Sequence, residues 1–163
     1  MKKIIVLIAL VIAPAISYGQ SIFDKLENMD NVSSVVINKD AFEILSKFNI
    51  DDSDNEAMEI FKMIQNLKEL KVFKSNDAAV SSKMEKMVTT AIEKGKLTQL
   101  MRVKDKDSKV RIYVKSGKNK DYVSEVLMFV SGVSEMTQGQ AESVVVSLTG
   151  MIDINKISKL ADT

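Results

Sequence analysis

The stretch LTQLMRVKDKDSKVRIYVK, residues 97–115, indicates the fold class of this chain. On both sides of Lys106 and Asp107 its residues alternate with a period of two, which is typical of strands that present one face to a core. The two residues between the series predict a turn, so the stretch predicts an antiparallel hairpin. One series contains Leu97, Gln99, Met101 and Val103 against Thr98, Leu100, Arg102 and Lys104, and the other contains Val110, Ile112 and Val114 against Arg111, Tyr113 and Lys115.

The residues immediately before the hairpin have a helical period instead. Asp77 can accept hydrogen bonds from the first free amides of a helix. Gly95 is the residue type that favours the left-handed conformation at a helix C-terminus. The sequence therefore predicts a helix between these two residues, with an apolar side made of Val80, Met84, Met87, Val88, Ala91 and Ile92.

After the hairpin, two more strands are expected. The run Val126–Val130 is apolar on both faces, as in a central strand covered on both sides, although a core helix segment has the same pattern. A polar loop at Gly132–Gln140 leads to a second run at Ser143–Leu148. Gly150 then predicts a turn, and Asp153 predicts the N-cap of a last helix that carries Ile154, Ile157 and Leu160.

The N-terminal half of the chain mixes helical and strand patterns. The runs Val32–Ile37 and Leu70–Phe73 predict strands, and three amphipathic segments predict helices. The third of these helices has its cap within Asp52–Asn55. The apolar stripes contain Ile22, Phe23, Leu26 and Met29, then Ala41, Phe42, Leu45 and Phe48, and then Met58, Phe61 and Ile64, with Ile60 and Leu67 as further candidates for the third stripe.

These elements together predict an α+β fold. Successive strands joined by short turns pair antiparallel, and amphipathic helices bury their apolar stripes against a sheet. We therefore expect an antiparallel-rich sheet of about six strands with amphipathic helices packed on it.

The first nineteen residues have the three parts of a bacterial signal peptide. Lys2 and Lys3 precede an apolar run from Ile4 to Ile16, and small residues at Ser17 and Gly19 fit a signal peptidase. The run is shorter than the roughly 20 residues of a membrane span, which disfavours a permanent anchor. We expect cleavage before Gln20, which leaves residues 20–163 as a single periplasmic or secreted domain.

Charge and composition narrow the partners and the chemistry. Loss of two lysines with the signal peptide changes the net charge from +1 to −1, so no bulk field attracts nucleic acid or acidic lipid. The chain has no histidine and no cysteine, which removes the usual catalytic triads, thiolate metal sites and lipid attachment through cysteine. No cofactor or metal is expected, because the acids of residues 51–56 are better explained as a helix cap than as a calcium loop.

One set of basic and aromatic residues on the hairpin forms the candidate site. Its two interpretations are the solvated face of an antiparallel sheet, which we favour, and a binding face for an anionic partner. The set contains Arg102, Lys104, Arg111, Tyr113 and Lys115.

The export signal that ends in Gly19 before Gln20, the late apolar strand and the ending VVVSLTGMIDINKISKL, residues 144–160, resemble a family of Bacteroidetes envelope proteins known as domain of unknown function 4252. The resemblance implies an exported protein or lipoprotein, sometimes encoded near envelope-stress sigma and anti-sigma factors. It implies no catalytic residues. This chain departs from the lipoprotein members because it lacks cysteine.

Two function classes follow from these observations. The first is a binding or regulatory module without catalysis, which contacts an envelope protein through a sheet face or an edge strand, and homo-oligomerisation stays open. The second is a hydrolase that uses carboxylates or serine in a cleft. A pocket with convergent carboxylates of shifted pKa would support the enzyme, whereas a flat sheet or an exposed apolar patch would support the module.

Overall fold

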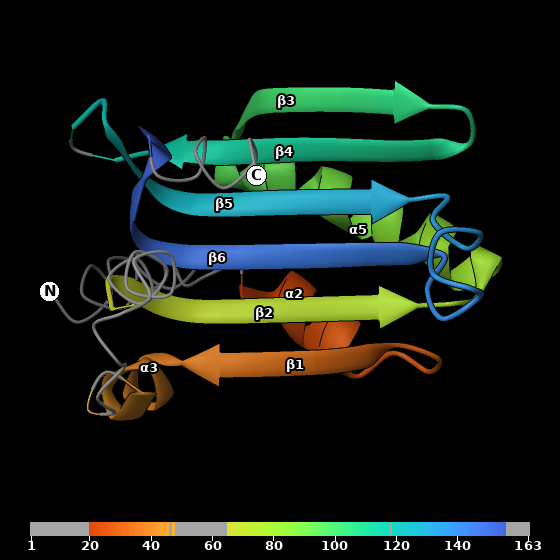
Figure 1. Ribbon diagram of the computed structural model, residues 1–163, viewed down its shortest axis with the longest axis horizontal. Helices are drawn as coiled ribbons and strands as arrows, with labels where there is room; N and C mark the ends of the chain where they lie inside the picture. The colour runs from red at the N-terminus through yellow and green to blue at the C-terminus, as the bar shows by residue number, and fades with distance from the viewer. Residues whose placement is uncertain (1–19, 46, 48–64, 118, 156–163) are drawn as a thin grey trace, which may run out of the picture.

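The computed structural model describes residues 20–45, 47, 65–117 and 119–155. They form a six-stranded sheet in the order β1-β2-β6-β5-β4-β3, in which every pair of neighbours is antiparallel (Figure 1). The α+β prediction and the expected strand number are therefore confirmed. The strands are β1 (Ser33–Asn38), β2 (Leu67–Ser75), β3 (Thr98–Asp105), β4 (Ser108–Ser116), β5 (Tyr122–Ser131) and β6 (Ser143–Asp153).

The described helices are α2 (Gln20–Glu27), α3 (Lys39–Leu45) and α5 (Ala78–Gly95). Both α2 and α5 lie behind the sheet in Figure 1, whereas α3 continues from the end of β1. None of the helices in this part of the chain is long and apolar enough to cross a membrane. The signal peptide and the predicted helix with Met58, Phe61 and Ile64 lie outside the described residues, as do Ile157 and Leu160 of the last helix. Leu67, a further candidate for the helix with Met58, is instead the first residue of β2, where it pairs with Gly150.

The ends of α5 confirm one predicted cap and correct the other. The Asp77 carboxylate accepts hydrogen bonds from the amides of Ala79 and Val80, at 2.8 and 3.0 Å. The left-handed residue at the C-terminus is Lys96, with φ 53°, so the prediction for Gly95 is wrong. The helix continues through Gly95 because the Leu97 amide then donates to the Ile92 carbonyl and the Leu97 side chain becomes buried.

The end of β6 corrects a second prediction. Gly150 does not form a turn, because β6 continues through it to Asp153. The glycine has φ 148°, and a Cβ there would overlap the Asn66 carbonyl oxygen at the start of β2. Asp153 does cap the next residues, since its carboxylate accepts a hydrogen bond from the Asn155 amide at 2.9 Å.

The predicted strands are confirmed, and several are longer than their sequence patterns. The predicted hairpin forms from β3 and β4, and Lys106 has a left-handed φ of 48° at its turn. The predicted alternation is wrong at the start of β3, because a register shift between Gln99 and Met101 places these two residues on opposite sides and puts Thr98 on the side of Met101. The run Val126–Val130 is the middle of β5, a central strand paired with β4 and β6. The core lies between the sheet and the two helices behind it and contains Phe73, Leu127, Phe129 and Val145 from the sheet with Leu26, Met84 and Val88 from the helices.

Candidate interaction surface

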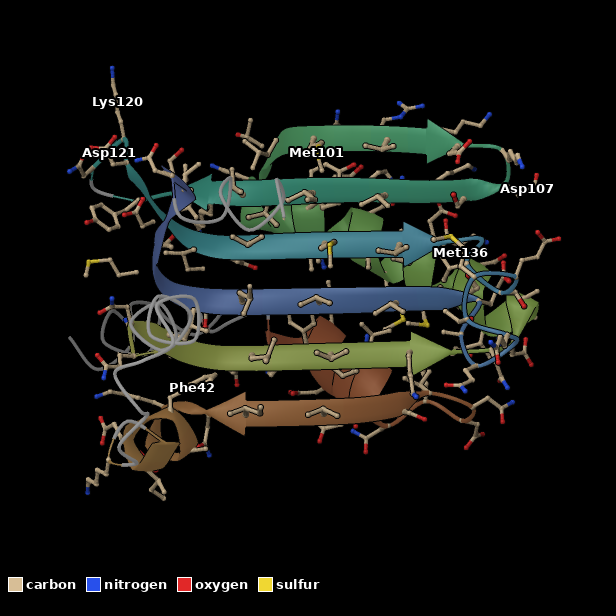
Figure 2. All side chains as sticks on the ribbon, viewed as in Figure 1. Phe42, Met101, Asp107, Lys120, Asp121 and Met136 are labelled. Carbon is tan, nitrogen blue, oxygen red and sulfur yellow. The ribbon has the colours of Figure 1, made fainter. Side chains whose placement is uncertain are left out.

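The strand registers divide the sheet residues between two faces. Successive residues of a strand point to opposite sides, and residues paired across strands share a side. Phe73, Val145 and Phe129 are aligned across three strands and belong to the core beneath α2 and α5, so we call this side the helix-side face. The other side, which Figure 2 shows toward the viewer, is called the open face.

The helix-side face has an apolar centre. Phe73, Phe129, Leu127 and Val145 have no exposed surface, and the Phe23 ring of α2 stacks on Phe73 with 6.1 Å between ring centroids. Burial of this centre against α2 and α5 holds the helices on the sheet, because removal of apolar area from water stabilises the packed state.

All five residues of the predicted partner-binding set lie on the helix-side face. Arg102 pairs with Arg111, and Lys104 pairs with Lys109, two residues before Arg111 on β4. Tyr113 and Lys115 follow Arg111 at alternate positions and share its side. The structure therefore gathers these residues on one face, and their role in binding stays a prediction.

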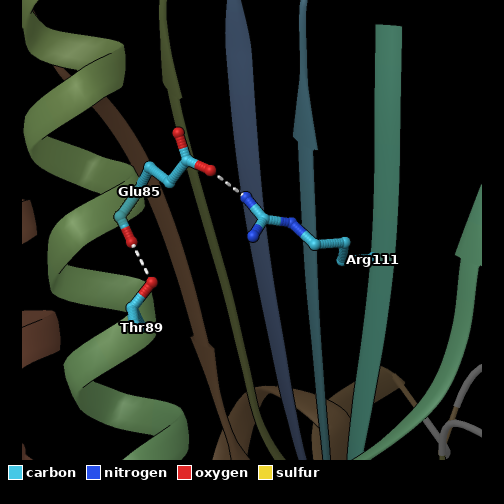
Figure 3. Close-up of polar contacts among 3 residues, drawn as sticks. All are labelled: Glu85, Thr89 and Arg111. Atoms are coloured by element: carbon cyan, nitrogen blue, oxygen red, sulfur yellow. Dashed lines mark hydrogen bonds and ion pairs between the residues drawn. The ribbon is translucent and has the colours of Figure 1, made fainter. Parts of the chain in front are cut away.

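Arg111 already has intramolecular partners on this face. Its guanidinium forms an ion pair with Glu85 of α5 (Figure 3). The same group lies 5.2 Å from the centroid of the Phe129 ring. Thr89 is one turn further along α5, where its hydroxyl donates to the Glu85 carbonyl at 2.9 Å. Arg111 thus ties α5 to β4, which makes it a structural residue in addition to a candidate binding residue.

A second set of charged residues lies in the same two rows of the helix-side face as Tyr113 and Lys115. Lys71 is 8% exposed, and its ammonium is 3.3 Å from a carboxylate oxygen of Glu69 and 5.6 Å from the centroid of the Phe23 ring. Glu69 and Glu125 are both paired with Thr149, so they flank β6 on either side. Burial raises the pKa of the Glu125 carboxyl, and nearby Lys115 lowers it by a smaller amount.

Three of the open hollows on the molecule are lined by described residues, and Glu69 and Glu125 line none of these three. One of them, of about 360 Å³, lies between the β3–β4 turn and the loop after β5. The described residues also contain no group of three or more acids that could hold a metal ion.

The open face has a different composition from the helix-side face. Three rows of paired residues cross all six strands, and within them only Thr98, Ser33 and Lys74 are not apolar. The first row is Ile37, Leu70, Leu148, Val126, Val114 and Thr98; the second is Val35, Val72, Val146, Met128, Ile112 and Met101; the third is Ser33, Lys74, Val144, Val130, Val110 and Val103.

The open face is least exposed at the first row and on the central strands, and most exposed on the two edge strands, β1 and β3. Val114 and Val126 in the first row are buried, because they cluster with Ile154, which follows β6, and with Ile152. Toward the strand edges, Val35 is 55% exposed and Val103 is 46% exposed. Asp105 follows Val103 on this side of β3, so Lys74 and Asp105 are charged residues at the same end of the face.

The apolar pattern of this face is present in the sequence, but the pattern alone does not show which face of the sheet the helices leave uncovered. The run Val126–Val130 predicts a strand covered on both sides, and its side chains do alternate between the two faces of the sheet. The helix-side half is covered by α2 and α5. On the open half, the cover in the described part of the chain is the cluster around Ile154 at one end. The candidate surface is therefore the open face, whose residues the sequence patterns did not bring together.

The fold and this surface define an α+β protein that presents one apolar side of an antiparallel sheet. Residues 23–160 match the family described as Domain of unknown function (DUF4252), and the chain belongs to this family. The resemblance noted from the sequence is thereby confirmed. No curated protein and no solved structure matches the chain.

Proposed function

We propose that this chain is a binding or regulatory module of the bacterial envelope that acts without catalysis and contacts a protein partner through the open face. The observation that carries the proposal is the composition of the three rows, which are apolar except at Thr98, Ser33 and Lys74. Contiguous apolar surface of this extent on a folded protein marks an interaction site, because its exposure to water is unfavourable.

The open face also has the shape that a protein partner requires. A six-stranded antiparallel sheet offers a broad surface, and its half-buried valines and isoleucines have few rotamers to lose on contact. Small-molecule sites are usually concave, with a few polar groups directed inward. The second row has no polar residue, so this surface supports contact with another apolar surface.

Export to the envelope is the second part of the proposal. It is supported by the N-terminal pattern of two lysines, an apolar run and small residues before Gln20. Mass spectrometry of the protein recovered from fractionated cells tests this part. We expect a mature mass that begins at Gln20 in the soluble envelope fraction, whereas a retained Met1 in the membrane fraction would contradict it.

The hydrolase alternative has less support. It requires carboxylates or a serine that converge on a substrate-sized cleft. Glu125 has a raised pKa, but it is separated from Glu69 by β6, and neither residue lines the hollows described above.

Site-specific photo-crosslinking in living cells tests the proposed surface. A photoreactive amino acid is placed at Met128, in the centre of the open face, and a matched variant carries it at Ser82, which is exposed on α5. We expect covalent protein adducts from position 128 only. An absence of adducts at position 128, or equal adducts from both positions, would contradict the proposal.

A further inference from the structure

We propose that the protein partner on the open face is a second copy of this chain, so that two sheets pack face to face as a two-fold symmetric β-sandwich. This inference rests on the proposed function, because it names the partner of the same surface.

The first argument is the match between two such faces. Sheets in β-sandwiches pack about 10 Å apart with their strands nearly aligned, and their inner faces are filled by β-branched and other apolar side chains. The open face has this composition, and the second row offers no charge or hydrogen-bonding side chain to a partner. A partner that covers it must itself be apolar over a similar area, which a second copy satisfies.

The second argument is area. Six strands at about 4.8 Å each and three rows at about 6.7 Å each give a footprint of roughly 29 by 20 Å. Val114 and Val126 are already buried, so two copies would cover roughly 1,000 Å² before the relief of the side chains is counted, which is the lower limit for a specific interface.

The third argument is charge complementarity, and it selects the symmetry axis. A two-fold axis along the strands, between β5 and β6, places β2 of one copy over β4 of the other and keeps the same strand ends together. Lys74 then approaches the corner where the partner copy carries Asp105, and the same contact occurs twice. An axis across the strands would instead place Lys74 over Leu70 of the other copy, where its charge would have no partner.

The charges of the helix-side face fit this arrangement. In the sandwich both helix layers face outward, so Arg102, Lys104 and Lys109 stay in water. The face that carries the charges remains solvated, and the apolar face becomes the dry centre of the dimer.

Analytical ultracentrifugation of the protein purified from the envelope fraction tests the inference. We expect a species of twice the chain mass. Val146→Lys, in the second row next to the axis, should raise the dimer dissociation constant at least about a hundredfold, because it buries an unpaired charge. Circular dichroism checks that this variant stays folded.

Val35→Lys and Val36→Lys form the matched control pair. Both residues are exposed neighbours on β1, but Val35 lies on the open face and Val36 on the helix-side face. Only Val35→Lys should weaken the dimer, by roughly tenfold, since it lies at the edge of the contact. Equal effects of the two variants would contradict the assigned face.

Charge reversal tests the partner itself without disturbing the apolar rows. Lys74→Asp alone should weaken the dimer roughly threefold to tenfold, because it places two acids together. The double variant with Asp105→Lys should restore wild-type affinity. Failure of the double variant to restore affinity would overturn the assigned symmetry.

The outcomes separate this inference from the proposed function. A wild-type protein that sediments as a monomer at tens of micromolar overturns the second copy as partner, whether another protein or another part of the chain covers the face. If crosslinked adducts from position 128 then have a mass other than twice the chain, the binding-module proposal stands. A monomer without adducts would overturn both.

Discussion

The helix-side face and the open face are built from neighbouring residues of the same six strands, yet they have opposite compositions. The helix-side face is covered by α2 and α5 and still carries Lys71, Glu125 and Arg111, arranged around a small apolar centre. The open face has less cover in the described part of the chain and is apolar in almost every position of its three rows. Cover by α2 and α5 therefore does not explain where the six strands place their apolar residues.

Two physical reasons account for the charges on the helix-side face. Two helices are narrower than six strands, so the residues at the margins of that face keep contact with water or with helix side chains such as Glu85. Long basic side chains can also lie along apolar rings while their charged ends find partners, as Lys71 does beside Phe23. Within the part of the chain that the structure describes, the nearly continuous apolar rows of the open face have no such explanation, which is why we assign them to a contact with a partner.

The largest expected difference between the faces is in folding stability. Leu127 and Met128 are neighbours on β5, and Leu127 is fully buried on the helix side whereas Met128 is half-buried on the open side. Leu127→Ala should lower the free energy of unfolding by about 3 kcal/mol because it leaves a cavity. Met128→Ala should cost about 1 kcal/mol or less in the monomer.

Urea denaturation of the two variants measures this difference. At protein concentrations that favour the proposed dimer, the effect of Met128→Ala should increase, whereas that of Leu127→Ala should not. Equal losses at every concentration would indicate that both faces are interior to one chain, and the distinction between them would be lost.

A smaller effect is expected for the ion pair that ties α5 to the helix-side face. Glu85→Ala leaves the guanidinium of Arg111 partly buried without its carboxylate partner, and should cost about 1 to 2 kcal/mol of unfolding free energy. The control is Lys39→Ala, which breaks the exposed pair with Glu43 and should cost about 0.5 kcal/mol or less. Thermal denaturation followed by circular dichroism distinguishes the two, and similar small losses would show that Arg111 does not depend on Glu85.

The smallest expected effect concerns Glu125 at the margin of the helix-side face. Burial raises the pKa of Glu125 in the folded state above the ordinary value of 4.5. The folded state therefore binds this proton more tightly than the unfolded state does, and the resulting gain in folding stability is fully present below pH 4.5. This contribution is lost as the pH rises through the raised pKa. Glu125→Gln should therefore stabilise the protein at pH 7, by less than about 1 kcal/mol given its partial exposure, and should flatten the pH dependence above pH 4.5.

Stability measured as a function of pH in the wild type and Glu125→Gln tests this sign. A variant that is less stable than wild type at pH 7 would mean that attraction to Lys115 outweighs the burial of the carboxylate.

Local patterns in the sequence predicted local structure well. The hairpin turn at Lys106 and the helix that begins after Asp77 form as expected, because turns and caps depend on residues that are close along the chain. The bulge between Gln99 and Met101 breaks the alternation that the sequence predicted for the first strand of the hairpin. The errors at Gly150 and Gly95 arose where a distant contact decides the conformation. Gly150 is required by the approach of Asn66, and the left-handed position moved to Lys96 as Leu97 entered the core.

The candidate site was predicted less well for the same reason. The basic set of the hairpin does lie on one face, but the sequence could not indicate that this face is the one beneath α5 or that Arg111 pairs with Glu85. Nor could it indicate that the valines opposite this set line up with those of β5 and β6 in continuous rows. Register between strands and the side on which helices dock are non-local properties.

By itself, the sequence determined the α+β class, the positions of most strands and of α5, the family, and the absence of histidine and cysteine, because these depend on residue identity and short-range periodicity. The tertiary structure alone decided the strand order, the face on which the helices pack and the union of six separate apolar series into one surface. These features depend on pairing between residues far apart in the chain. Such pairs contribute favourable free energy only after the intervening chain has been ordered into the sheet.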